Sequence, residues 1–373
     1  MSERPFRFYD NRQKYLAFVT TCNEKWKIAE RAVQELSGIE PKLPAFHIYD
    51  AGMGDGAVLG NVMRAVHQHF PTVPMLVVGK EISLEDIRLC LEKLPDRFVE
   101  HPAMVVVFTN LYYAEAPWLR PHKPENVDKL NWITLELSGH SAYEYGEQLS
   151  ALEPQLVDGW QVRASPKTGN PLYVRPSVLV MYRRDYRFLL EPVLAHCRAN
   201  RAEYDLILAA QAWRARMPAE FKVQKVLGPV ARSLRPGGRA LVVQSSGRDP
   251  GIELIREIWP DEDPFQVDRH ALIAALTVDL GPDVDKYQFD GLDADESIFR
   301  FDMHTLPDEI AKSIGTSTLF AAWNAAIYVA QIEDARLEQA VSTGHYLQAT
   351  AKILKKYSGL WFNDEAFVIS RRE

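Results

Sequence analysis

A glycine-rich turn with a carboxylate at its start is the segment of this sequence best suited to bind a ligand. Residues 50–56 read Asp-Ala-Gly-Met-Gly-Asp-Gly and follow the apolar run of residues 46–49. Gly52, Gly54 and Gly56 can adopt positive φ angles and let the backbone approach a ligand closely. The turn alone does not identify the ligand, because Gly52, Gly54 and Ala57 also satisfy the G-x-G-x-x-A spacing of dinucleotide-binding loops.

Two acidic residues beside this turn narrow the choice of ligand. Asp50 precedes Gly52 by two positions, where a pyrophosphate-binding loop usually has no negative charge. A carboxylate there suits a ligand that carries an ammonium group. Glu81 follows a second apolar run, 29 positions after Gly52, where a carboxylate can accept hydrogen bonds from both ribose hydroxyls. The pair favours an adenosine ligand with a cationic end, although a ribose carboxylate is also typical of NAD sites.

Three further segments, taken with this turn, resemble the class I S-adenosylmethionine-dependent methyltransferases. Residues 78–83 read Val-Gly-Lys-Glu-Ile-Ser, residues 204–210 read Tyr-Asp-Leu-Ile-Leu-Ala-Ala, and residues 226–243 pass through Leu-Arg-Pro-Gly-Gly into an apolar run. The last segment is the most specific, because proline fixes φ and glycines supply positive φ for a sharp reversal. The resemblance covers residues 44–110 and 204–245. It implies a Rossmann-like, mostly parallel seven-stranded sheet with one reversed strand, and S-adenosyl-L-methionine as the cofactor.

The resemblance also assigns cofactor contacts to residues at the ends of four strands. Asp50 and the glycines would line the methionine end of the cofactor, Glu81 would bind the ribose, and Ile82 would lie against the adenine. Asn110 would contact the adenine amino group, since an amide both donates and accepts. Residues after the fourth strand would border the methyl-transfer centre. The full predicted set is Asp50, Gly52, Met53, Gly54, Gly56, Glu81, Ile82, Asn110, Leu111, Ala209 and Gln211.

Catalytic groups are harder to predict, because methyl transfer is an in-line displacement that depends mainly on alignment. A base is needed only where the acceptor is protonated. The candidates are Tyr113, which follows the third apolar run, and His140, within Ser-Gly-His-Ser-Ala-Tyr at residues 138–143. No metal site is predicted, since Cys22, Cys90 and Cys197 are widely spaced and form no zinc pattern.

The order of apolar runs predicts the elements that position these residues. Short runs at residues 46–49, 75–78, 104–108, 206–209 and 240–243 suit buried parallel strands, with helical spacing between most of them. Residues 12–36 are expected to form a preceding helix, and residues 360–371 a closing strand at or near a sheet edge. The predicted division is a helical cap at 1–40, a methyltransferase core at 41–110 and 201–373, and an insertion at 111–200. That aromatic-rich insertion is expected to be a lid, an acceptor-binding segment or a dimer interface.

Composition bounds the function further. The chain has 373 residues, is 47% hydrophobic and carries a formal net charge of −7, so it can bury a full core and has no general attraction to nucleic acid. Charges near the N-terminus exclude a signal peptide, and no apolar run could span a membrane, which favours the cytoplasm. The sequence thus predicts methyl transfer to an oxygen or nitrogen of a small molecule, with a homodimer left open. The alternatives are an NAD-dependent oxidoreductase, or a non-catalytic domain that binds an adenosine ligand or a protein.

Overall fold

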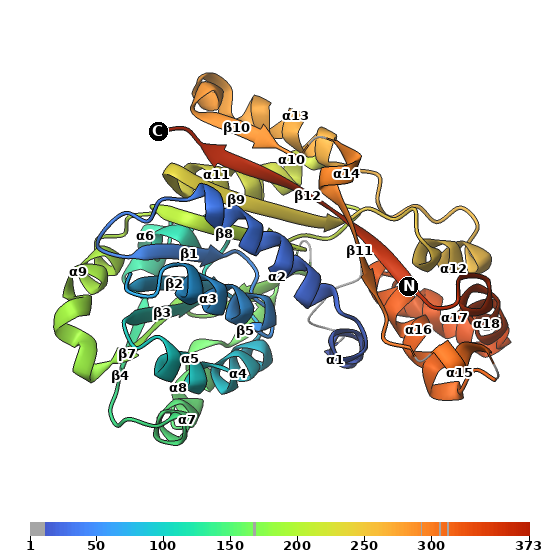
Figure 1. The fold of residues 1–373 in the computed structure, drawn as a ribbon, viewed down its shortest axis with the longest axis horizontal. Coiled ribbons are helices and arrows are strands. Elements are labelled where there is room, and N and C mark those ends of the chain that lie inside the picture. The colour runs from blue at the N-terminus through green and yellow to red at the C-terminus, as the bar shows by residue number, and fades with distance from the viewer. Residues whose placement is uncertain (1–11, 167–168, 292, 306, 312) are drawn as a thin grey trace.

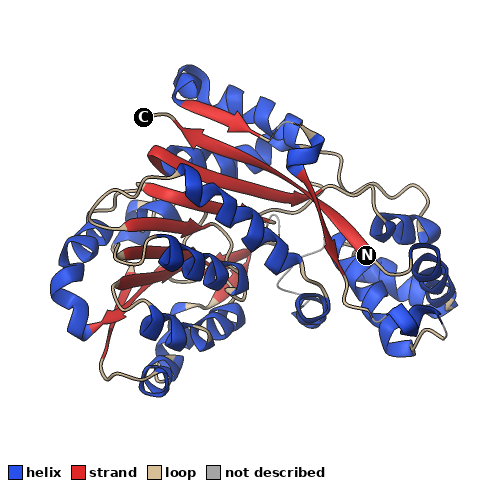
Figure 2. Cartoon of the chain, viewed as in Figure 1, coloured by secondary structure: helices blue, strands red, loops and turns tan. Residues whose placement is uncertain are grey.

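One large twisted sheet with helices on both faces makes up most of the molecule, and a helical lobe lies beyond one end of it (Figure 1, Figure 2). The computed structural model describes residues 12–166, 169–291, 293–305, 307–311 and 313–373. The strands are β1 (Phe46–Asp50), β2 (Met75–Lys80), β3 (Met104–Thr109), β4 (Asn131–Leu137), β5 (Val162–Ala164), β6 (Pro171–Tyr173), β7 (Ser177–Arg183), β8 (Tyr204–Ala210), β9 (Leu234–Ser245), β10 (Tyr287–Asp290), β11 (Ile298–Asp302) and β12 (Trp361–Arg371).

The strand order of the sheet is β10-β12-β9-β8-β1-β2-β3-β7-β4, and β11 pairs with the first half of β12. Strands β3, β2, β1, β8 and β9 are parallel neighbours, while β12 is antiparallel to β9 and to β10. The predicted count of seven strands is too low, because the described sheet has ten. Across the sheet, the seven neighbouring strands from β3 to β10 run in one direction except β12, which is reversed. The others are β11 and, beyond β3, the strands β7 and β4.

One apolar cluster covers each face of this sheet, so β1, β2 and β3 are buried on both sides. Each predicted run in this region became a strand within one or two residues of its expected ends. The helices of one face are α2 (Glu24–Gln34), α3 (Ala57–His69), α4 (Leu84–Glu92), α5 (Leu94–Glu100), α7 (Ala142–Ser150) and α8 (Glu153–Gly159). The other face is covered by α9 (Arg187–Arg198), α10 (Ala219–Lys222), the π-helical turn η5 (Val223–Leu227), α11 (Gly228–Ser233) and α13 (Arg269–Leu280).

The described part of residues 111–200 extends this layered core. Strand β7 pairs antiparallel with β3, and β4 pairs parallel with β7, so the insertion widens the sheet at its β3 edge. Its helices α7 and α8 pack on one face and α9 on the other. Of the described strands in this segment, β5 and β6 form a separate two-stranded sheet.

The helical lobe is formed by the chain between β11 and β12 and has its own apolar cluster. Its helices are α15 (Pro307–Ala311), α16 (Thr316–Val329), α17 (Asp334–Thr343) and α18 (His345–Tyr357), with α12 (Pro250–Ile258) packed against α16 and α18. Helix α1 (Arg12–Thr21) also joins this cluster and packs against α16 (Figure 1). Residues 201–373 therefore contain a second structural unit that the predicted division did not separate.

The predicted helix over residues 12–36 is interrupted between α1 and α2. Cys22 forms a β-bridge with Met303, and the side chain of Asn23 accepts a hydrogen bond from the backbone amide of Asp302 at 2.7 Å. The end of β11 therefore replaces the helical hydrogen bonds at this point. As a result α1 belongs to the lobe, whereas α2 packs against α3 of the sheet.

Candidate functional site

Asp50 ends β1 at the centre of the sheet, between Gly79 of β2 and Leu208 of β8. Its side chain is 3% exposed, and its Oδ1 accepts a hydrogen bond from the backbone amide of Gly52 at 3.1 Å. Burial raises the pKa of Asp50 to about 7, although the Gly52 amide and the ammonium of Lys25 oppose the rise. A buried carboxylate of this kind is stabilised in its charged form by a cationic ligand.

The glycine turn has the backbone geometry that its sequence predicts. Gly54 has φ 52° and Gly56 has φ 75°, in the left-handed region that favours glycine. A Cβ atom on Gly56 would lie 2.3 Å from Sγ of Cys90, and one on Gly54 would lie 2.9 Å from the hydroxyl of Tyr15. The turn therefore depends on glycine both for its conformation and for the space around it.

Glu81 links the end of β2 to this turn. Its Oε1 accepts hydrogen bonds from the backbone amides of Ile82 at 2.7 Å and Ser83 at 2.8 Å, and its Oε2 accepts one from Gly54 at 3.1 Å. Burial raises the pKa of Glu81, while neighbouring Lys80 lowers it. The three amides fix the carboxylate in one orientation beside the glycine turn.

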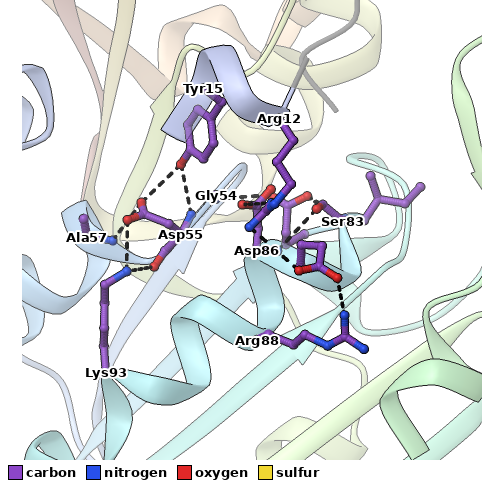
Figure 3. Close-up of polar contacts among 12 residues, drawn as sticks. Arg12, Tyr15, Gly54, Asp55, Ala57, Ser83, Asp86, Arg88 and Lys93 are labelled. Atoms are coloured by element: carbon purple, nitrogen blue, oxygen red, sulfur yellow. Dashed lines mark hydrogen bonds and ion pairs between the residues drawn. The ribbon is translucent and has the colours of Figure 1, made fainter. Parts of the chain in front are cut away.

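Helix α1 covers the same turn through polar contacts that Figure 3 shows. The hydroxyl of Tyr15 donates to Oδ1 of Asp55 and accepts from the Asp55 amide, each at 3.2 Å. Lys93 pairs with Asp55 at 2.9 Å, and Arg12 pairs with Asp86 at 3.1 Å. The sequence alone did not single out Tyr15 or Asp55 for this contact, since helical periodicity does not say where a helix docks.

A cleft of about 510 Å³ opens beside these carboxylates, at the carboxyl ends of β2, β3 and β8. Its walls come from Lys80 and Ile82, the loop after β3, residues 170–172 of the insertion, and residues 211–226. Of the predicted residues, Ile82, Tyr113 and Gln211 line it, whereas Asp50, Glu81 and the glycines lie outside its lining. Tyr113 connects the two regions, because a Cβ on Gly52 would be 3.9 Å from its hydroxyl.

Tyr113 lines the cleft but is poorly suited to act as the predicted base. Burial raises its pKa, and the carboxylates of Glu81 and Asp50 raise it further. The Nζ of Lys80 lies 4.4 Å from the centre of its ring. The phenol therefore stays protonated near neutral pH and can donate a hydrogen bond rather than accept a proton.

Asn110 has a structural role in place of the predicted adenine contact. The side chain is completely buried, and its amide nitrogen donates to the carbonyls of Gly159 and Arg175 at 2.8 and 2.9 Å. Its oxygen accepts from the amide of Ser177 at 2.8 Å. Both donor hydrogens are thus used to join the end of β3 to the insertion, and none is left for a ligand.

Three other predicted contacts are packed into the protein interior. Leu111 and Ala209 are completely buried in the apolar cluster on the α9 and α13 face, and Met53 is 4% exposed in the opposite cluster. The sulfur of Met53 lies 3.9 Å from Sγ of Cys90 beneath the glycine turn. These side chains shape the turn and the strand ends, and only their backbones could face a ligand.

His140 lies away from the cleft, contrary to the predicted catalytic role. It follows β4, which runs antiparallel to β3. The carboxyl end of β4 therefore lies on the side of the sheet where β1, β2 and β3 begin, and the glycine turn lies on the side where they end. The residue is exposed, and its backbone amide donates to Glu144 in the capping box of α7. Sequence order misled the prediction, because the direction of an inserted strand is not visible in its residues.

Gln211 joins the cleft to a buried polar cluster that the sequence did not predict. Its Nε2 lies 3.1 Å from Oγ of Ser245, 3.2 Å from Oδ1 of Asp364 and 3.5 Å from Oε1 of Glu24. Burial raises the pKa of Asp364 well above its usual range, and Glu24 raises it further. Helix α2 and strands β9 and β12 thereby fix the residue that follows β8.

The insertion supports the loops after β2 and β3 directly. The indole nitrogen of Trp160 donates to the backbone carbonyl of Glu81 at 2.9 Å. The buried carboxylate of Glu115 accepts from the amides of Tyr112 at 3.2 Å and His122 at 2.9 Å, and from the hydroxyl of Tyr173 at 3.2 Å. The loop after β3 therefore holds its shape through one buried acid.

Within the described residues, no three His, Cys, Asp or Glu side chains are grouped so that they could hold a metal ion. None of the described helices is long and apolar enough to cross a membrane.

Comparisons with known proteins find similarity in structure only. No protein-family model matches the chain, and no curated protein sequence matches it. Loganic acid methyltransferase with SAH is 11% identical, with a TM-score of 0.36 over 98% of this chain and 95% of that chain. Geranyl diphosphate methyltransferase in complex with SAM is 10% identical, with a TM-score of 0.33 over 100% and 98%. A Galdieria sulphuraria protein assigned as a sarcosine dimethylglycine methyltransferase is 10% identical, with a TM-score of 0.38 over 93% and 86%.

Identities and TM-scores at this level are too low for the names of these proteins to define the activity of this chain. Its fold class rests on its own strand order. The chain has a doubly wound α/β fold, in which the carboxyl end of β1 carries Asp50 and the glycine turn and the carboxyl end of β2 carries Glu81.

Proposed function

We propose that this protein transfers the methyl group of S-adenosyl-L-methionine to a nucleophilic oxygen or nitrogen of a small molecule. The observation that carries the proposal is the placement of Asp50 and Glu81. Asp50 ends β1 and Glu81 directly follows β2, so both carboxylates lie at the carboxyl ends of neighbouring parallel strands beside one glycine turn. On its other side β1 borders β8, where the strand order reverses. In open α/β sheets, ligands bind at this switch point.

The residues around the turn fit the two polar parts of the cofactor. Asp50 would face the α-ammonium group, which favours the charged form of a carboxylate whose pKa burial has raised. Glu81 would accept a ribose hydroxyl with the lone pairs that its three backbone amides leave unused. Ile82 and Gln211 lie where β2 and β8 end and line the adjoining cleft. The bound cofactor would supply an electrophilic methyl group on its sulfonium.

The protein's own contribution to the reaction is alignment and the exclusion of water. Tyr113 lies close to Gly52 on one side and faces the cleft on the other, so it can orient an acceptor by donating a hydrogen bond. The net charge of −7 disfavours a nucleic acid as the acceptor.

An NAD-dependent oxidoreductase is the alternative that the glycine spacing allows. The buried carboxylate of Asp50 opposes it, since its oxygen accepts the Gly52 amide that a pyrophosphate would otherwise use. A domain without turnover is the second alternative, and it predicts cofactor binding without a product.

Calorimetric titration with S-adenosylmethionine, S-adenosylhomocysteine and NAD distinguishes the methyltransferase from the NAD-dependent oxidoreductase. We expect the first two to bind and NAD not to bind. Asp50→Asn and Glu81→Gln should each weaken S-adenosylhomocysteine by tenfold or more, about 1.4 kcal/mol. Asp261→Asn changes an exposed acid in the same way and serves as the matched control. Binding of NAD alone, or full affinity in both site variants, would overturn the assignment.

A further inference from the structure

Basic side chains gather in the cleft beside the cofactor residues. Lys80, Arg214, Lys222 and Lys225 all line it. The acidic side chain among the described lining residues is Glu115, and its two oxygens already accept three hydrogen bonds from the loop after β3. The cleft therefore has an excess of positive charge although the chain as a whole is acidic.

Lys222 is the most deeply placed of these groups. The residue is 1% exposed, and its Nζ lies 3.3 Å from Oε1 of Gln244 and 5.8 Å from the ring centre of Trp213. Gln244 shares that oxygen with the indole nitrogen of Trp213. The nearby carboxylate of Glu365 pairs instead with Arg269 at 3.2 Å. Among the described residues, none places a carboxylate within 4 Å of Lys222 Nζ.

Lys80 is similar in position and in environment. It is 6% exposed, and its Nζ lies over the ring of Tyr113. Adjacent Glu81 uses its carboxylate on the three backbone amides, so it forms no ion pair with Lys80 in the described structure. Burial lowers the pKa of Lys80 and lowers that of Lys222 to about 8. Two buried ammonium groups that lack a paired anion are costly unless a ligand supplies the charge.

The remaining cleft walls are apolar and aromatic. Tyr112, Trp213, Met217 and Phe221 contribute them, and the ring of Tyr112 stacks on Tyr173 at 4.4 Å. A purely polar anion such as inorganic phosphate would leave these surfaces uncovered. An apolar body attached to an anionic oxygen group would cover both kinds of wall.

We propose that the methyl acceptor is a small molecule with an anionic oxygen group, a carboxylate or a phosphate, on an apolar or aromatic body that Lys222 and Lys80 bind in this cleft. That the bound molecule is methylated rests on the proposed function, whereas the anion site itself can be tested without the cofactor. The lysines orient the molecule, and the methylated atom is a separate one, since an anion paired with lysine is a weaker nucleophile.

Matched probes test the anion site. The full chain is titrated with 4-phenylbutyrate, 4-phenylbutyl phosphate, 4-phenylbutanol and 4-phenylbutylamine, and binding is followed by ligand-observed NMR. We expect one or both anions to bind below about 10 mM and the alcohol and the amine to bind at least tenfold more weakly. Preference for the carboxylate or for the phosphate tells the two sources of the anionic group apart. Binding of the alcohol or the amine as tightly as the anions, or no binding of either anion, would overturn the proposal.

Lysine variants assign the binding to the cleft. Lys222→Met and Lys80→Met keep most of the side-chain volume and should each weaken the preferred anion at least tenfold, while Lys129→Met, an exposed control outside the cleft, should not. Binding of S-adenosylhomocysteine to Lys222→Met should stay within twofold of wild type, which also shows that the variant is folded. If the wild-type chain does not bind S-adenosylhomocysteine, the proposed function is refuted and the anion site is not. If both lysine variants keep the wild-type affinity for the anion, the anion site is refuted and the proposed function is not.

Discussion

The buried positive charge of Lys222 predicts that this residue destabilises the folded chain. Burial lowers its pKa from 10.5 to about 8. That difference corresponds to about 3 kcal/mol at 1.36 kcal/mol for each pKa unit. Because the ammonium borders a solvent-accessible cleft, we expect screening to reduce the effect to about 1 to 2 kcal/mol. Lys222→Met should therefore stabilise the folded chain near neutral pH, even though it removes a hydrogen bond to Gln244.

The dependence on pH separates the charge effect from changes in packing. Below about pH 8 the lysine is protonated in both the folded and the unfolded chain, so the destabilisation is fully present. Between about pH 8 and 10.5 the folded chain releases the proton while the unfolded chain keeps it, and wild-type stability rises toward that of the variant. The packing of the uncharged methionine side chain, in contrast, does not depend on pH.

Urea unfolding of wild type, Lys222→Met and the exposed control Lys129→Met at about pH 7 and about pH 10 measures this difference. The free-energy gap between Lys222→Met and wild type should narrow by about 1 to 2 kcal/mol at the higher pH, and the control should show no such change. A gap that stays constant, or one that widens, would refute the claim that Lys222 is held as a costly buried cation. An anion bound in the cleft should also narrow the gap at neutral pH.

Three further predictions concern the glycine turn and the candidate bases. Gly56→Ala should destabilise the chain by about 2 to 4 kcal/mol, since its Cβ would overlap Sγ of Cys90 and its φ is 75°. Adding Cys90→Ala should restore part of that loss in thermal unfolding, and no recovery would contradict the steric explanation. The affinity for S-adenosylmethionine should rise as pH increases through about 7, because Asp50 binds an ammonium group only when it is deprotonated, and Asp50→Asn should abolish this rise. His140→Ala should leave cofactor affinity unchanged, and a loss comparable to that of the Asp50 variant would show that our placement of this residue is wrong.

The sequence predicted the centre of the fold well because local rules determine it there. The strands β1, β2 and β3 are continuous apolar runs, and a strand buried on both faces has this pattern. Gly54 and Gly56 have the positive φ angles that the motif requires. The placement of Asp50 and Glu81 on either side of the turn follows from parallel neighbouring strands, which bring carboxyl ends to one edge.

Predictions failed where the outcome depended on pairing over long distances. Asn110 and His140 both stand beside strands, but the reversed direction of β7 and β4 places the first against the insertion and the second at the opposite edge. Apolar spacing gives no information about strand direction. The break between α1 and α2 arises in the same way, because residues near Met303 take up the hydrogen bonds of the intervening segment.

Long-range contacts also determine which segments surround the glycine turn. Strands β4 and β7 of the insertion are built into the sheet, since they pair with each other along seven residues and β7 pairs with β3 over five. Trp160 further anchors the insertion to the carbonyl of Glu81. Helix α1 is joined to the turn by the buried hydrogen bonds between Tyr15 and Asp55 and by the partly exposed ion pair of Arg12 with Asp86.

Helix α1 belongs structurally to the lobe, because it packs against α16 and the side chain of Asn324 donates to the carbonyl of Lys14 at 2.9 Å. Displacement of α1 would uncover Gly54, since Tyr15 occupies the space in front of that residue. The sheet, with most of the insertion built into it, borders the glycine turn, and α1, which lies in the predicted N-terminal cap, covers the turn through Tyr15.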